Sequence, residues 1–294
     1  MRSEGLAPVA GPAGVIGAVD APGRSMAAIA PADLIHPQWP APAHVGAFMT
    51  TRRGGVSAGS WASLNLGRSV GDAPLAVAEN RRRFCASLGG EPAPVRPVWL
   101  HQVHGTQVLE LEAGSPEHPS TPADAAWTRA PGVACVVGAA DCMPVLFTTA
   151  DGCAVAAAHA GWRGLAAGVL EATVAALTKG ASVRCADVIA WLGPCIGPRH
   201  FEVGADVLAA FAVAAAEVDS EYFAYAPRPD GAPRWRADLR GLARRRLDGL
   251  GLGSIGGDEA CTYEDASRFF SFRRDGSRGP SGRMAAAIWL AARG

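Results

Sequence analysis

The order of apolar and polar positions predicts buried strands in the middle of the chain. Residues 132–139 form one apolar run, and residues 143–150 and 153–161 form two more, separated by Asp151 and Gly152. Short apolar runs bounded by turn residues are typical of buried strands. Asp-Gly between two such runs is a strong hairpin signal. A connection this short requires the two strands to be antiparallel.

The register of this hairpin follows from counting across its turn. If Asp151 and Gly152 are the two loop residues, Pro144 lies opposite His159, and Cys142 lies just beyond that pair. The hairpin therefore brings Cys142 and His159 to the same end of the sheet, within reach of one metal ion.

The rest of the chain mixes further strands with helices. Helices are expected over 73–90, 164–180, about 204–217 and 238–250, the first with Pro74 near its start and Gly89-Gly90 at its end. Strands are expected in 46–57, on both sides of Gly105 in 97–111, in 187–194, and on both sides of a flexible turn in 269–291. Because strict βαβ alternation is missing, the pattern predicts an α/β (α+β) fold, a compact mixed-sheet sandwich with flanking helices.

The N-terminal segment differs from the rest in composition. It is rich in Gly, Ala and Pro, so residues 1–35 are predicted to be a disordered extension. It lacks the compact apolar core of a signal peptide, and Met26 is an alternative start. Residues 36–294 contain no long linker, charge block or repeat, which indicates a single compact domain.

Charge and cysteine content narrow the class of protein. Lys+Arg and Asp+Glu number 27 each, so the balance gives no reason to expect nucleic acid or an anionic membrane as partner. Seven cysteines in a long chain argue against a disulfide framework and fit a reducing cytoplasm, where we expect this protein. No apolar run is long enough for a spanning helix without polar interruption.

Three residues suggest a metal site: His104 in HQVHG, Cys142 in GAADCMP and His159 in AAAHAGWRG. Two imidazoles and one thiolate suit a catalytic Zn²⁺ whose fourth position stays open. Their spacing matches no zinc finger, and a lone His or Cys in an apolar strand is more often a packed core residue. His101 is a competing ligand, but on a strand it points away from the face that carries His104. We therefore choose His104, beside the permissive Gly105.

Several arginines lie next to glycines or helix starts, where they could bind an anion. Guanidinium groups match phosphate and carboxylate oxygens, and glycine lets backbone N–H groups approach the same oxygens. The alternative is that each is an ordinary surface arginine. The candidates are Arg52 and Arg53 before Gly54, Arg163 in HAGWRG, and Arg273, Arg274 and Arg283 around the last turn.

Acid, base and nucleophile candidates cluster around the same segments. Cys142 near His159 could form a Cys–His hydrolytic pair, a role that competes with metal binding. Asp141 could carry a proton or orient a ligand through a hydrogen bond, or it could simply be a turn aspartate. Glu202 could be a further acid/base group, or it could cap a helix or pair with Arg199.

Taken in order, the motifs resemble those of the laccase-domain family, long called multicopper polyphenol oxidases and now viewed as purine nucleoside phosphorylases. The motifs are TTRRGGVS, SLNLG, QVHG, ADC-P-LF, AAAHAGWRG, GPCIGP-FEVG, CTY and FFSFRRD-GRMAAAIWL, and they cover about residues 37–292. The resemblance implies a compact fold with mixed sheets and a zinc held by two His and one Cys. These ligands fall on His104, Cys142 and His159. The role of Cys195 in GPCIGP stays open.

The resemblance implies a zinc-dependent purine nucleoside phosphorylase acting on adenosine, inosine and methylthioadenosine, with adenosine deamination at the same site. Purine nucleosides and phosphate would be the partners. Asp141, Cys142 and Arg163 are the candidate catalytic residues, and the candidates for binding substrate or phosphate are Arg52, Asn65, Arg163, Arg273 and Arg283.

Two other activities stay open. A peptidoglycan-precursor editing hydrolase could use the same metal site. A copper polyphenol oxidase could bind Cu²⁺ through the same ligands, but it needs further His-rich copper sites. The remaining histidines, His36, His44, His101, His118 and His200, are scattered. The sequence decides neither the preferred nucleoside nor the oligomeric state.

Overall fold

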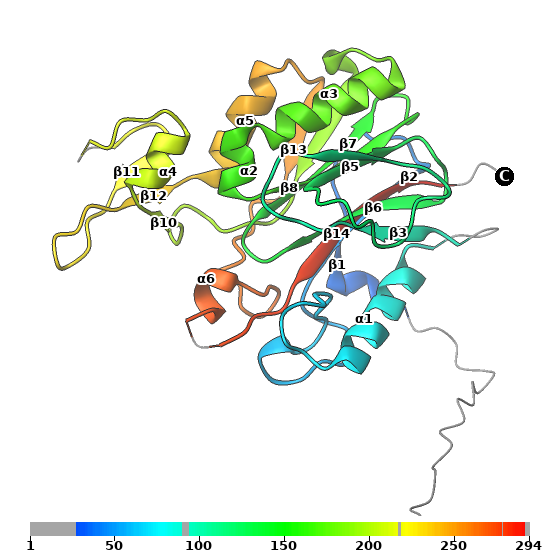
Figure 1. Ribbon diagram of the computed structural model, residues 1–294, viewed down its shortest axis with the longest axis horizontal. Helices are drawn as coiled ribbons and strands as arrows, with labels where there is room; N and C mark the ends of the chain where they lie inside the picture. Colours follow the sequence, from blue (N-terminus) through cyan, green and yellow to red (C-terminus); the bar gives the residue numbers. More distant parts are fainter. Residues whose placement is uncertain (1–27, 90–93, 217–218, 278, 292–294) are drawn as a thin grey trace, which may run out of the picture.

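Two β-sheets packed face to face form the centre of the protein (Figure 1). The computed structural model describes residues 28–89, 94–216, 219–277 and 279–291. One sheet has the order β1 (Leu34–Ile35), β2 (Val45–Thr50), β14 (Met284–Leu290), β6 (Val133–Ala139), β3 (Arg96–Trp99). The other has the order β13 (Ser254–Gly257), β9 (Val188–Leu192), β7 (Met143–Thr149), β8 (Val155–Ala160), β5 (Ala125–Thr128), β4 (Val108–Leu111).

Both sheets are mixed, as the sequence predicts. The pairs β3–β6, β4–β5 and β9–β13 are parallel, and the other pairs in these two sheets are antiparallel. Leu146 and Ala157 of the central hairpin pack between the sheets, against residues such as Val137 and Ile288. Val145 and Phe147 point to the opposite face, toward the helices. Burial on both faces explains why the hairpin strands are continuously apolar.

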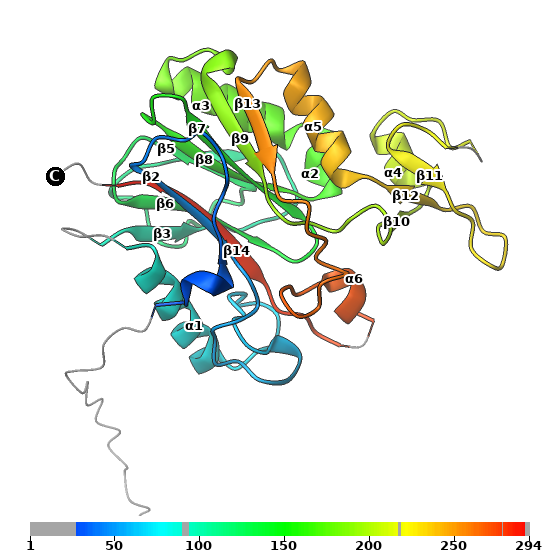
Figure 2. The same cartoon turned by 180° about the vertical axis from the view of Figure 1, so that it is seen from behind.

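Helices cover the two outer faces and complete four layers (Figures 1 and 2). On the five-stranded sheet, Phe84 of α1 (Pro74–Ser87) packs in an apolar cluster with Phe48 and Val136. The six-stranded sheet is covered by α2 (Trp162–Ala167), α3 (Val169–Ala181) and α5 (Leu239–Gly249). The apolar face of α3 packs on β8 and β5.

Shorter elements complete the fold. A third sheet, β10 (Glu202–Val203), β12 (Trp235–Ala237) and β11 (Phe223–Tyr225), lies with α4 (Ala205–Ala210) to one side of the sandwich (Figure 1). The last helix of the described chain is α6 (Phe272–Asp275), and short 3₁₀ turns are η1 (Pro31–Asp33), η2 (Gly59–Trp61) and η3 (Cys185–Asp187). Among the helices of the described residues, none combines the length and apolar character needed to cross a bilayer.

The fold class and most of the predicted elements are confirmed, but three elements differ. The single helix expected over 164–180 is split into α2 and α3, because Gly168 takes φ 99°, a left-handed conformation that ends a helix. The helix expected over 204–217 ends at Ala210, and Ala212 has φ 56°. The first strand expected within 269–291 is replaced by α6, which Ser271 caps by accepting a hydrogen bond from the Arg274 N–H at 3.1 Å.

Residues 28–35, which the sequence predicts to be part of the extension, pack against the domain. Leu34 and Ile35 pair with β2, and Ile29 is buried and donates its N–H to Ser87 Oγ. Residues 28–35 are therefore part of the domain, and the rest of the expected extension, with Met26, lies outside the described residues.

Candidate metal centre and its cavity

The β7–β8 hairpin positions two of the three candidate ligands. Pro144 pairs with His159 and Met143 with Ala160, which is the predicted register. Cys142 immediately precedes β7, so it lies at the same end of the hairpin as His159. The turn is longer than the predicted two residues, since β7 ends at Thr149 and β8 begins at Val155.

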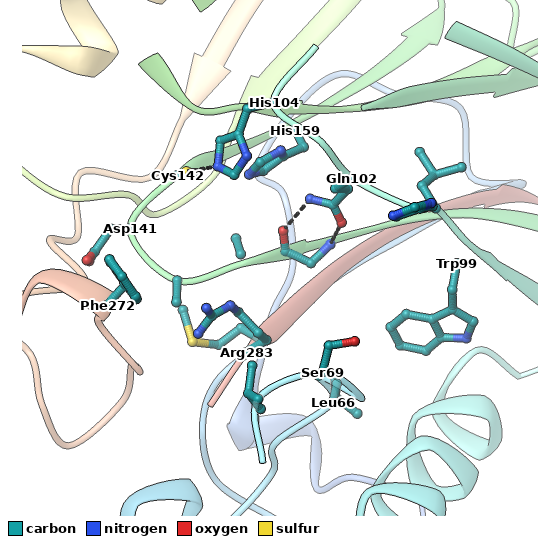
Figure 3. Close-up of a pocket in the computed structure, with 18 of the residues that line it drawn as sticks. Leu66, Ser69, Trp99, Gln102, His104, Asp141, Cys142, His159, Phe272 and Arg283 are labelled. Carbon is teal, nitrogen blue, oxygen red and sulfur yellow. Dashed lines mark hydrogen bonds between the residues drawn. The ribbon is translucent and has the colours of Figure 1, made fainter. Parts of the chain in front are cut away.

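His104 reaches the pair from a loop between β3 and β4. Its Nε2 lies 3.8 Å from Cys142 Sγ, and its ring meets that of His159 edge to face with centroids 4.8 Å apart (Figure 3). One ligand atom from each of the three residues lies within 4.8 Å of the others. The competing His101 also lines the cavity, but it does not belong to the group formed by His104, Cys142 and His159.

Asp124, which the sequence did not single out, holds two of the ligands in place. Its fully buried carboxylate accepts hydrogen bonds from His159 Nδ1 at 2.8 Å and from the N–H groups of Val103, His104 and Gly105 at 3.1, 2.9 and 2.7 Å. These bonds stabilise the left-handed backbone of His104, whose φ is 62°. Since Nδ1 of His159 is used in this way, Nε2 is free to face a metal.

The three ligands also influence each other electrostatically. Burial raises the pKa of the Cys142 thiol, but the charge of His159 and hydrogen bonds from both imidazoles outweigh it and lower the pKa to about 6. Burial lowers the pKa of His159, but Cys142 and Asp124 outweigh it and raise the pKa to about 9. The cysteine is therefore favoured as a thiolate, the form that binds metals.

Gly161 lets the ligands approach each other. A Cβ at this position would lie 2.9 Å from Cys142 Sγ and 2.9 Å from His104 Cδ2, closer than real Cβ contacts. The donor set fits a divalent metal, because tetrahedral zinc places a sulfur and a nitrogen ligand about 3.6 Å apart. Small side-chain adjustments would bring all three donors to one ion.

The candidate ligands lie in a cavity of about 690 Å³, with Arg283 also in its lining (Figure 3). Asp141 is the one acidic residue among the described residues that line it. Five arginines also line the cavity: Arg68, Arg81, Arg163, Arg273 and Arg283. A whole chain of zero formal charge thus has a strongly positive cavity, which favours an anionic ligand there.

Asp141 connects the ligand loop to α6. Its carboxylate accepts hydrogen bonds from Thr262 Oγ1 at 2.6 Å, Ser271 Oγ at 2.9 Å and the N–H of Arg273 at 2.7 Å. Its backbone is left-handed, with φ 83°. Asp124, rather than Asp141, makes the hydrogen bond to a ligand that the sequence suggested for Asp141.

Of the candidate substrate-binding residues, Arg163, Arg273 and Arg283 line the cavity. Arg163 is exposed, and its guanidinium lies 4.3 Å from the Trp162 ring centroid. Arg273 donates from Nη1 to the carbonyl of Glu202. Burial lowers the pKa of Arg283, although the charges of Cys142 and Asp141 oppose that effect.

Arg52 and Asn65 are not among the described residues that line the cavity. Arg52 Nε and Nη1 donate to the carbonyls of Ala62 and Ala266, and its guanidinium lies over Phe270. Asn65 is fully buried; its amide oxygen accepts from the N–H of Arg283, and its amide nitrogen donates to Asp72. Both side chains hold loops together.

Arg53 and Arg274, also considered as anion-binding residues, bond to the protein as well. Arg53 donates to the carbonyl of Ser267, and Arg274 to those of Thr262, Tyr263 and Phe269.

Two other candidates also have structural partners. Glu202 pairs with Arg228 at 2.6 Å, whereas Arg199, its expected partner, pairs with Glu264 at 2.8 Å. Cys195 is fully buried, and burial raises the pKa of its thiol to about 12, which leaves it unreactive.

Fold and site together define a mixed-sheet α/β protein with a candidate two-histidine, one-cysteine metal site at one end of an arginine-lined cavity. The chain belongs to the family described as multi-copper polyphenol oxidoreductase laccase, whose model matches residues 46–291.

Curated relatives and solved structures resemble the chain over nearly their whole length. It is 49% identical to a purine nucleoside phosphorylase of Pseudomonas aeruginosa, covering 86% of this chain and 97% of the relative. It is 47% identical to the purine nucleoside phosphorylase YfiH of Escherichia coli, covering 87% and 98%. The structure of YlmD from Geobacillus stearothermophilus matches with a TM-score of 0.73 at 32% identity, covering 85% of this chain and 93% of that one.

Proposed function

We propose that this protein is a metal-dependent purine nucleoside phosphorylase. The observation that carries the proposal is that the three candidate ligands and five arginines line one cavity. The names of the relatives, at 47–49% identity, support the same activity. The reaction would break the C1′–N9 bond of a purine nucleoside, join a phosphate oxygen to C1′ and leave the purine with a proton.

His104, Cys142 and His159 would hold the metal, for which we propose zinc because its catalytic sites use three protein ligands of these types. When bound, a divalent cation supplies a Lewis acid beside the reacting bond. Asp124, which accepts hydrogen bonds from His159 Nδ1 and the His104 N–H, would keep both residues oriented toward the metal.

Arginines of the cavity would bind the phosphate. Arg163 and Arg273 come from α2 and α6, and Arg283 immediately precedes β14, so three separate elements place guanidinium groups around one space. Guanidinium groups bind phosphate oxygens in charge-assisted pairs and stabilise negative charge that develops in the reaction. The Asp141 carboxylate accepts a hydrogen bond from the Arg273 N–H and so holds the backbone of Arg273. Asp141 would also carry a proton during the reaction.

The proposed substrates are adenosine, inosine and methylthioadenosine, with deamination of adenosine as a second reaction of the same site. The test is to incubate the purified protein with each nucleoside, with and without phosphate, and to separate the products by chromatography. We expect phosphate-dependent release of free base and ribose 1-phosphate, and inosine from adenosine without phosphate. No base release from any of the three nucleosides would refute the phosphorylase.

Two cysteine variants make this test specific. Cys142→Ala removes a proposed ligand, and Cys153→Ala removes a thiol at the other end of the same hairpin. Turnover and zinc content should be lost in the first and kept in the second. Equal effects of both variants would indicate that the hairpin is merely damaged.

The oxidase in the family's description is less well supported by the ligands. Among the described residues, one group of three or more His, Cys, Asp or Glu side chains could hold a metal. A multicopper oxidase needs several such groups. Phosphate-independent oxygen consumption with a phenol and copper would support the oxidase instead.

A further inference from the structure

A second set of basic side chains lies in the same cavity, away from the metal ligands. Arg68, Arg81 and His118 line it together with Trp99 and Ser69. Figure 3 shows Ser69, Leu66 and Trp99 on the side of the cavity opposite the three ligands. Arg68 belongs to the loop before α1, Arg81 to α1 and His118 to the loop after β4. Three separate segments therefore meet at this end.

Arg81 is held rigidly by its neighbours. Its guanidinium lies 3.9 Å from the centroid of the Trp99 ring, and its Nε donates to the carbonyl of Leu66 at 3.0 Å. Its Nη1 lies 3.3 Å from His118 Nε2. Stacking and these bonds fix the plane of the guanidinium, so that its remaining N–H groups are pre-organised for a ligand.

The two arginines at this end form no ion pair with the part of the protein that the structure describes. Among the described residues, neither Arg68 nor Arg81 has a carboxylate within 4.0 Å. Glu117 attracts Arg81 electrostatically, but its carboxylate is half exposed and lies 3.5 Å from His118 Nε2. Burial and the like charge of Arg68 together lower the pKa of Arg81 to about 10, although the charge of Glu117 opposes them.

A partly buried guanidinium without a counter-ion is unfavourable, and an anion supplied by a ligand removes the penalty. We propose that Arg68 and Arg81 form an anion subsite that binds a phosphate group at the end of the cavity remote from the metal ligands. This inference rests on the proposed function for the nucleoside part of the ligand. The phosphate could come from a phosphorylated nucleoside spanning the cavity or from inorganic phosphate.

The test is titration calorimetry of the full-length protein with 5′-AMP, adenosine and inorganic phosphate as separate probes. Arg81→Gln and Arg68→Gln remove the two charges. Arg82→Gln is the matched control, because Arg82 is the next residue of α1, pairs with Glu79 and does not line the cavity. Arg68→Gln covers the possibility that Arg81→Gln unfolds, because the Arg68 side chain is exposed.

We expect 5′-AMP to bind the wild type at least about tenfold more tightly than adenosine, from one charge-assisted contact. Arg81→Gln and Arg68→Gln should each reduce this preference about tenfold, while Arg82→Gln keeps it. If inorganic phosphate shows the same dependence on Arg68 and Arg81 and 5′-AMP has no advantage, the subsite takes free phosphate. If all three probes bind both arginine variants as tightly as the wild type, the subsite proposal is overturned.

These outcomes are separable from the proposed function. Base release from adenosine together with arginine-independent binding would overturn the subsite alone. Arginine-dependent binding of 5′-AMP without base release from any nucleoside would overturn the phosphorylase alone.

Discussion

Gly161 lies directly against two of the three candidate ligands, so Gly161→Ala tests the metal site with a single methyl group. The added carbon would lie 2.9 Å from Cys142 Sγ and from His104 Cδ2. Non-bonded carbon atoms prefer about 3.5–4.0 Å. The two side chains must therefore move by roughly 0.6–1.1 Å.

The backbone itself tolerates alanine at this position. Gly161 has φ −71° and ψ 160°, a conformation open to any residue. The clash involves the ends of two side chains, so the cost of overpacking should stay within about 1–3 kcal/mol of unfolding free energy. Metal ligands, in contrast, must stay within about 0.5 Å of the productive geometry. We expect zinc affinity to fall by about tenfold to a hundredfold, a loss comparable with that of an outer hydrogen-bond partner.

The measurement is competition for zinc between the protein and a chromogenic chelator, combined with a thermal melt in the absence of metal. Gly114→Ala is the control, because a Cβ there meets nothing within 4 Å. A Gly161→Ala protein that melts like the wild type but binds zinc weakly supports the geometry. Wild-type zinc affinity in this variant would refute the reasoning that Cys142 and His104 converge over Gly161.

Three further predictions test the surroundings of the site. Asp124→Asn should weaken zinc binding by about tenfold to a hundredfold in the same assay, because an amide cannot accept all four hydrogen bonds; unchanged affinity would show that Asp124 does not orient the ligands. Asp141→Asn should lower the unfolding free energy by about 2 kcal/mol in urea denaturation. The reason is that at least one of the three groups that donate hydrogen bonds to the Asp141 carboxylate loses its acceptor. Full stability with lost turnover would instead identify Asp141 as a proton carrier. Removing zinc with a chelator should destabilise the wild type by about 4 kcal/mol, the value for metal at a thousandfold excess over Kd, and should leave Cys142→Ala unchanged; equal shifts in both proteins would contradict the ligand assignment.

The central hairpin shows that part of the candidate site could be predicted from residues close together in the sequence. The pairing of Pro144 with His159 followed from two apolar runs and an Asp-Gly turn, although the turn proved longer than two residues. A longer turn keeps the same pairing of residues when it takes an equal number of residues from each strand. Two of the three ligands were therefore placed by residues less than twenty positions apart.

The arginines show where a linear pattern was not enough. Arg52 and Arg163 both lie beside glycines in the sequence, yet one bonds to the carbonyls of Ala62 and Ala266 while the other lines the cavity. Arg81 had no motif at all, since it lies within an ordinary helix. Whether a guanidinium meets a carbonyl, a ring or open space depends on segments far away in the chain.

The sequence by itself determined the mixed sandwich, the hairpin and the approach of Cys142 to His159, because strand periodicity and turn chemistry act between near neighbours. Only the tertiary structure decided that Asp124 bonds to the candidate ligand His159 and that Arg68 and Arg81 share the cavity. Those arrangements arise where loops from different layers meet. Buried charges and hydrogen bonds there are set by packing between residues that no local pattern connects.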